Sequence, residues 1–150
     1  MKLPYSDGSA FLVPLRNGGY ARGVVARGAS RGKVLLGYFF GPRIESPKSA
    51  VLDGLDPANA VLRLRFGDLG LINGKWAIIG KVSNWNPAEW PMPEFVRRDP
   101  LSKKAWVVRY ADSDPRQVVS ERPTDFDSRL PEDPLAGYGA AEIILTKLVS

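Results

Sequence analysis

AFLVPLRNGGYARGVVAR, residues 10–27, consists of two apolar runs on either side of Asn17-Gly18-Gly19. Asn and Gly adopt positive φ angles at little cost, which the turn of a tight β-hairpin requires. In residues 20–27 the side chains alternate with a period of two, and small residues such as Ala21 and Gly23 fall on one side. The stretch therefore predicts an antiparallel hairpin of residues 11–15 and 20–29.

Patterns typical of β-strands continue along the rest of the chain. Residues 33–40 (KVLLGYFF) form a compact apolar run suited to a buried strand, and residues 60–66 (AVLRLRF) alternate between apolar and basic side chains. Residues 76–82 predict a further strand with a bulge at Gly80. Residues 105–110 resume the pattern, and residues 117–122 predict a short final strand at a sheet edge.

Helices and loops occupy the remaining segments. Ser46-Pro47 favours a short helix over residues 48–55, and residues 97–104 predict a charged turn. Residues 123–137 are rich in Pro, Asp and Glu and indicate an acidic surface loop, while residues 139–149 predict a helix that docks on the sheet. We therefore expect residues 1–150 to form a single, mainly β domain, either a curved antiparallel sheet or a small barrel, with a C-terminal helix.

Composition supports this expectation. A chain of 150 residues with 44% hydrophobic content buries roughly 70% of its unfolded surface as one domain. The sequence has neither an apolar run approaching the ~20 residues of a membrane span nor the apolar core of a signal peptide. It contains no Cys, which fits a reducing compartment. We expect a cytoplasmic protein without membrane contact.

The chain also contains no His, and this excludes several kinds of site. Without His or Cys there is no Ser-His-Asp or Cys-His catalysis and no zinc site built from these ligands. Neither a calcium-binding loop nor a phosphate-binding glycine loop is present. Asp112-Ser113-Asp114 is the nearest acidic spacing, and it predicts a solvated turn. We expect no metal and no cofactor.

The net charge of +5 is concentrated in the first half of the chain. Residues 1–75 hold 11 Lys/Arg and 5 Asp/Glu, whereas residues 76–150 hold 10 and 11. If Arg22, Arg63 and Arg65 share one sheet face, they form a patch that attracts nucleic acid or an acidic protein. The alternative, that they are ordinary outward residues of half-buried strands, is favoured, and no nucleic-acid-binding motif is present.

Residues 84–95 (NWNPAEWPMPEF) contain three prolines and two tryptophans, so they predict an extended loop rather than a strand or helix. Tryptophan is enriched in binding hot spots, which makes Trp85 and Trp90 candidates for a partner-binding platform. The competing interpretation is that the rings pack over the end of the sheet or barrel, and it is the favoured one.

Four motifs in order resemble the immunity protein 26 family, small antidote proteins associated with bacterial polymorphic toxins. The first is the hairpin signature F-x-x-P-L-x-N-G-x-Y-x-x-G-x-V, and the second is Tyr38-Phe39-Phe40. Residues 67–76 (GDLGLINGKW) and residues 89–95 (EWPMPEF) supply the other two. The resemblance covers about residues 10–122 and leaves the acidic loop and the final helix outside it.

The resemblance implies a cytoplasmic protein that binds a cognate toxin stoichiometrically and neutralises it. The family name is also coupled to a phosphotriesterase activity, which would need an activated water and usually a metal pair. Without His or Cys the carboxylates for such chemistry would include Asp68 and Asp99, which are also typical turn residues. We therefore expect no enzyme; a small hydrolase or a basic nucleic-acid-binding protein is the alternative.

Two sets of residues are candidates for toxin binding. Because the chain is basic, either the toxin offers an acidic contact surface or the acidic C-terminal segment makes the contact. The first candidate set is Trp85, Trp90, Arg97 and Arg98, all expected to be exposed. The second is Asp125, Asp127, Glu132 and Asp133.

Overall fold

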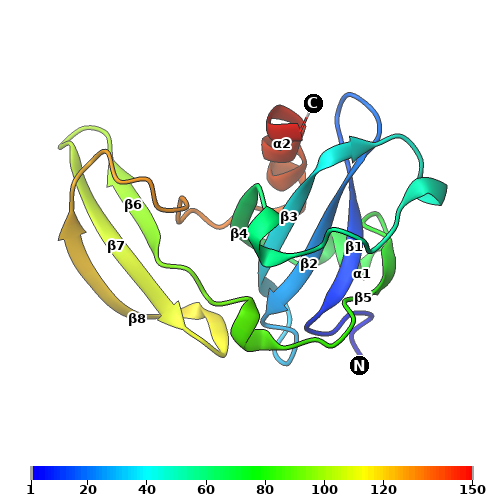
Figure 1. Cartoon of the computed structure of the whole chain (residues 1–150). Coiled ribbons are helices and arrows are strands. Elements are labelled where there is room, and N and C mark those ends of the chain that lie inside the picture. Colours follow the sequence, from blue (N-terminus) through cyan, green and yellow to red (C-terminus); the bar gives the residue numbers. More distant parts are fainter. Residues whose placement is uncertain (1, 150) are drawn as a thin grey trace.

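The computed structural model describes residues 2–149, which form two antiparallel sheets and a C-terminal helix (Figure 1). Sheet A has the strand order β4-β3-β2-β1-β5, and sheet B has the order β6-β7-β8. The strands are β1 (Ser9–Pro14), β2 (Tyr20–Arg27), β3 (Val34–Ile44), β4 (Leu62–Gly67), β5 (Ile78–Lys81), β6 (Phe95–Asp99), β7 (Lys104–Ala111) and β8 (Asp114–Thr124). The mainly β prediction is confirmed, and of its two forms the open sheet is correct, since the described strands close no barrel.

The hairpin predicted from residues 10–27 forms β1 and β2. The two strands pair antiparallel from Ala10 opposite Val24 to Pro14 opposite Tyr20. Gly18 and Gly19 in the turn have φ angles of 95° and 75°. A Cβ atom on Gly19 would lie 2.7 Å from the carbonyl oxygen of Ile44, so both the backbone angle and the close approach of β3 require glycine here.

One face of sheet A packs around Trp76, and we call this cluster the Trp76 core. The Trp76 ring stacks on Phe11 and on Phe66, with centroid separations of 5.5 Å in both cases. Helix α2 (Tyr138–Val149) covers this core, and Glu142 accepts a hydrogen bond of 2.9 Å from the Trp76 indole nitrogen. The helix predicted over residues 139–149 and its docking on the sheet are confirmed.

The opposite face of sheet A packs around Trp90, and we call this cluster the Trp90 core. Leu36 and Tyr38 of β3 meet Phe95 and Val108 of sheet B there. Both faces of β3 are thus buried, which explains why residues 33–40 are continuously apolar rather than alternating.

The helix predicted over residues 48–55 is absent from the structure. Arg22 reaches this segment and donates to the carbonyl oxygens of Val51 and Asp53, at 2.9 and 2.6 Å. The two hydrogen bonds tie this segment to β2, and only short turns form in it and beside it. These turns are the 3-10 helices η1 (Pro47–Ser49) and η2 (Pro57–Asn59).

Other boundaries differ from the predicted ones. Trp76 precedes β5 instead of opening it, with the short helix α1 (Leu69–Ile72) before it. Arg97 and Arg98 belong to β6 rather than to a turn, because they pair with Trp106 and Ala105 of β7. The last strand is also longer than predicted. The bulge expected at Gly80 is confirmed by a register shift beside its pair with Ala10.

None of the helices within residues 2–149 has the length and apolar character that a membrane crossing demands.

The small residues on one side of β2 yield a stability prediction. A Cβ atom on Gly23 would lie 2.5 Å from the Phe11 ring, so we expect Gly23→Ala to lower the free energy of unfolding by roughly 1–3 kcal/mol through overpacking. Gly67 also lies in a strand of sheet A and has no positive φ angle, and a Cβ atom there would lie 3.8 Å from the carbonyl oxygen of Lys33, an ordinary contact. Gly67→Ala is therefore the matched control, with a change within about 0.5 kcal/mol. Urea denaturation measures both, and equal values for the two variants would contradict this packing argument.

Candidate functional site

The segment after β8, residues 125–137, lies beside β6, and we call it the tail segment. The Val96 amide donates to the carbonyl oxygen of Pro131 at 2.8 Å, and the Asp133 amide donates to the carbonyl oxygen of Val96 at 2.9 Å. Figure 1 shows the tail segment (orange) passing from sheet B towards α2. It therefore pairs with the outer edge of β6.

Arg97 and Arg98 hold the tail segment in place. Arg98 forms an ion pair with Glu132 and donates from Nε to the carbonyl oxygen of Phe126 at 2.6 Å. Arg97 forms ion pairs with Glu121 at 2.9 Å and with Asp133 at 3.2 Å. Half of each predicted set of binding residues thus pairs with half of the other, Arg97 with Asp133 and Arg98 with Glu132.

Asp133 is the buried centre of this arrangement, with only 4% of its surface exposed. Besides Arg97, its carboxylate contacts Arg65 of sheet A at 3.4 Å and accepts from the Tyr110 hydroxyl at 2.5 Å. The Arg65 guanidinium also lies 4.0 Å from the centre of the Tyr110 ring. Burial, together with the hydrogen bond to Asp133, raises the pKa of Tyr110 to about 12. One carboxylate therefore connects sheet A, sheet B and the tail segment.

Two predicted acidic residues remain open to solvent. Asp125 and Asp127 are exposed, and neither has an Arg or Lys nitrogen within 4.0 Å among residues 2–149. Their charges are available to a partner, whereas those of Glu132 and Asp133 are engaged within the chain.

The expected exposure of Trp90 is wrong. This side chain is 3% exposed, and its ring centre lies 5.1 Å from that of Tyr38 and 6.1 Å from that of Phe40. Trp85 is half-buried, with its ring 5.3 Å from Trp90. The packing interpretation of the Pro/Trp-rich loop is therefore correct for Trp90, because the ring packs on Tyr38 and Phe40 of sheet A within the Trp90 core.

Most of the basic patch considered for Arg22, Arg63 and Arg65 is covered by other parts of the chain. Arg63 pairs with Tyr38, and Arg65 with Leu36, which places both on the Trp90 side of sheet A. Arg22 and Arg65 are 8% and 9% exposed, since other parts of the chain cover them. Of the three, only Arg63 keeps substantial contact with solvent.

Strand β8 has a long exposed surface that bears apolar side chains. Every residue from 116 to 123 is exposed, including Val118 at 43% and Val119 at 51%. Strand β7 pairs with one edge of β8, and within residues 2–149 no strand pairs with the other. Sequence reasoning identified the edge strand but not these valines. The sequence does contain a signal for them, since the two valines are adjacent within the otherwise polar run RQVVSER. Adjacent residues of a strand point to opposite faces, so both valines cannot lie on one buried face.

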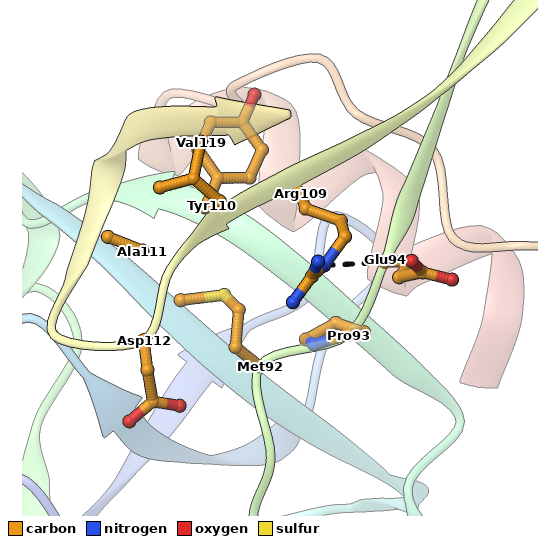
Figure 2. A pocket seen from close by; sticks show the side chains of 8 residues that line it. All are labelled: Met92, Pro93, Glu94, Arg109, Tyr110, Ala111, Asp112 and Val119. Carbon is orange, nitrogen blue, oxygen red and sulfur yellow. Dashed lines mark ion pairs between the residues drawn. The ribbon is translucent and has the colours of Figure 1, made fainter. Parts of the chain in front are cut away.

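A pocket of about 330 Å³ lies between β7, β8 and the segment that leads into β6 (Figure 2). Glu94 lies on one side of it, 3.7 Å from Arg109 and 2.9 Å from Arg122. The hydrogen bond from Arg122 holds the pKa of Glu94 below its ordinary value. Glu94 is therefore a fixed anion that orients two arginines. The pocket is lined by Met92, Pro93, Glu94, Arg109, Tyr110, Ala111, Asp112 and Val119.

The carboxylates considered for hydrolysis serve local structure. Asp68 accepts from the Tyr5 hydroxyl at 2.6 Å and from the Lys33 amide at 3.0 Å. Asp99 accepts from the Leu101 amide at 3.0 Å and from the Ser102 hydroxyl at 2.8 Å. Within residues 2–149, no three acidic side chains gather in an arrangement that could hold a metal ion.

Comparison with known proteins gives one family. The model of the family described as immunity protein 26 matches residues 6–107. No curated protein and no solved structure matches the chain. The matched region contains sheet A, β6 and the first part of β7, whereas β8, the tail segment and α2 lie beyond it. The resemblance inferred from the motifs is confirmed, although the match ends earlier than the expected residue 122.

The Asp133 cluster yields a second stability prediction. Asp133→Asn leaves Arg65 buried without its carboxylate, so we expect the free energy of unfolding to fall by about 3 kcal/mol. Asp125→Asn removes an equal charge from an exposed, unpaired position, and we expect a change below about 0.5 kcal/mol. Chemical denaturation gives both values, and limited proteolysis should cut the tail segment faster in Asp133→Asn alone. Indistinguishable variants would show that Asp133 does not secure this segment.

Proposed function

The chain belongs to the immunity protein 26 family, and we propose that it neutralises a cognate bacterial toxin by binding it in a stoichiometric protein–protein complex. Family membership supports an immunity role and a non-catalytic protein. In this proposal the chain covers the active site or an essential contact surface of the toxin in the cytoplasm. In this proposal the chain does not alter the toxin chemically, and it acts on no substrate of its own.

We propose β8 as the centre of the contact with the toxin. The observation that carries this proposal is the outer edge of this eleven-residue strand, which no strand among residues 2–149 covers and along which residues 116–123 are all exposed. Such an edge offers a row of backbone donors and acceptors, which proteins otherwise cover or interrupt. A partner strand added along it would gain main-chain hydrogen bonds and contacts to alternate side chains.

The side chains around this edge suit a protein partner. Val118 and Val119 supply apolar area, and Arg109 and Arg122 beside the pocket of Figure 2 supply donors oriented by Glu94. Arginine is enriched in binding hot spots. Strand β8 also lies beyond the part of the chain that the family model matches, and a contact specific to one toxin is expected outside the shared scaffold.

The residues predicted from sequence take different parts in this proposal. Trp85, Asp125 and Asp127 are accessible enough to contribute a second contact. Four of them act indirectly by holding the tail segment against β6: Arg97, Arg98, Glu132 and Asp133. Trp90 belongs to the core cluster that the two sheets share.

The test replaces the exposed valines. We expect Val118→Lys/Val119→Lys to fold normally, since both side chains are exposed, and to weaken toxin binding at least about 30-fold. Val51→Lys is the matched control, because Val51 is 55% exposed and precedes β4, away from β8. Calorimetry with the toxin domain encoded by the neighbouring open reading frame measures affinity and stoichiometry, and survival of cells producing that domain measures neutralisation.

Three results would contradict the proposal. Equal weakening by the control would show that β8 is not the contact. Protection by far less than one protein molecule per toxin would indicate catalysis. Retention on heparin and a salt-sensitive shift of DNA or RNA, without toxin binding, would favour the nucleic-acid alternative.

A further inference from the structure

Arg63 and Arg65 lie close together on β4, but among residues 2–149 only Arg65 has a carboxylate partner. Arg63 lies on β4 two residues before Arg65, and both side chains face the Trp90 side of sheet A. Arg65 is paired with Asp133 at 3.4 Å. Arg63 is half-buried, and no acidic side chain of residues 2–149 lies within 4.0 Å of its guanidinium.

A second unpaired cation lines the same depression. Arg129 of the tail segment and Arg63 line a hollow of about 250 Å³, and Arg129 is also without an ion pair among the described residues. A neighbouring hollow of about 400 Å³ shares Ala60 and Arg63 with the first. We call the two together the Arg63 groove. Its other lining residues are Tyr38, Pro57, Ala58, Val61, Leu62, Pro91 and Pro131.

The groove combines apolar walls with two guanidinium groups and has no acidic residue in its lining. The Tyr38 hydroxyl donates to the carbonyl oxygen of Pro91 at 2.6 Å and lies beside the Arg63 guanidinium. A guanidinium has five N–H donors, so Arg63 keeps donors for a ligand, as does Arg129. Guanidinium groups bind carboxylates through paired, charge-assisted hydrogen bonds.

We propose that the Arg63 groove binds an extended acidic segment of a protein partner. Its carboxylates would meet Arg63 and Arg129, and its apolar side chains would lie against the alanine and proline walls. Nucleic acid fits less well, because single strands need aromatic rings for stacking and a longer row of cations. The aromatic residue in this lining, Tyr38, is 2% exposed. The proposal rests on the proposed function only in identifying that partner as the toxin.

The test is an NMR titration of the isotope-labelled protein with a blocked peptide of Asp, Leu and Glu residues. We expect shifts of the backbone amides of Ala60, Arg63 and Arg129, and none with the same peptide carrying Asn and Gln. Arg63→Gln/Arg129→Gln removes two charge-assisted contacts and should weaken binding at least about tenfold. Lys81→Gln is the control, since Lys81 is exposed on β5 at the opposite edge of sheet A.

The inference is overturned if the uncharged peptide binds equally well, or if Lys81→Gln weakens binding as much as the double variant. Tighter binding of a single-stranded oligonucleotide or of inorganic phosphate at the same amides would overturn it as well. The toxin assay separates this inference from the proposed function. Toxin neutralisation without peptide binding refutes the groove alone, whereas peptide binding without any neutralisation refutes the proposed function alone.

Discussion

The carboxylate of Asp133 is the contact on which the arrangement of the two sheets and the tail segment depends. It neutralises Arg65 of sheet A, pairs with Arg97 of sheet B and accepts from Tyr110, all while nearly inaccessible to water. Removing the carboxylate from such a buried ion pair would leave the Arg65 charge without its counter-ion, which is strongly destabilising. The tail segment that carries Asp133 also carries Arg129, which lines the groove together with Arg63.

The two edges of sheet B differ in whether another segment pairs with them. The tail segment pairs with the outer edge of β6, while in the described chain the outer edge of β8 has no strand beside it. A long open edge carries a risk of aggregation, and natural proteins normally interrupt or cover it. Polar and charged side chains along most of β8 limit that risk, while Val118 and Val119 keep apolar area available. This asymmetry is why the proposed toxin contact lies on β8 and not on β6.

The candidate site was only partly predictable. The sequence predicts two competing contact surfaces, one with Arg97 and Arg98 and one with Glu132 and Asp133. They are largely one internal network, with partners more than 30 residues apart in the sequence. No local pattern reports such pairing, because ion pairs form wherever the folded backbone brings the side chains together. The expected exposure of Trp90 and the outward position of Arg22 are wrong for the same reason, since the groups that cover them lie far along the chain.

The sequence by itself determined the hairpin of β1 and β2, the buried strand β3, the bulge at Gly80 and the final helix, together with the family. These follow from turn chemistry and from hydrophobic periodicity, which act over a few residues. Tertiary structure alone decided that the strands form two sheets and that residues 48–55 form turns tied to Arg22. It also decided that, among residues 2–149, Arg65 has an ion pair and Arg63 has none. Each of these outcomes depends on contacts between groups that are far apart in the sequence. Such contacts form only when the whole chain packs.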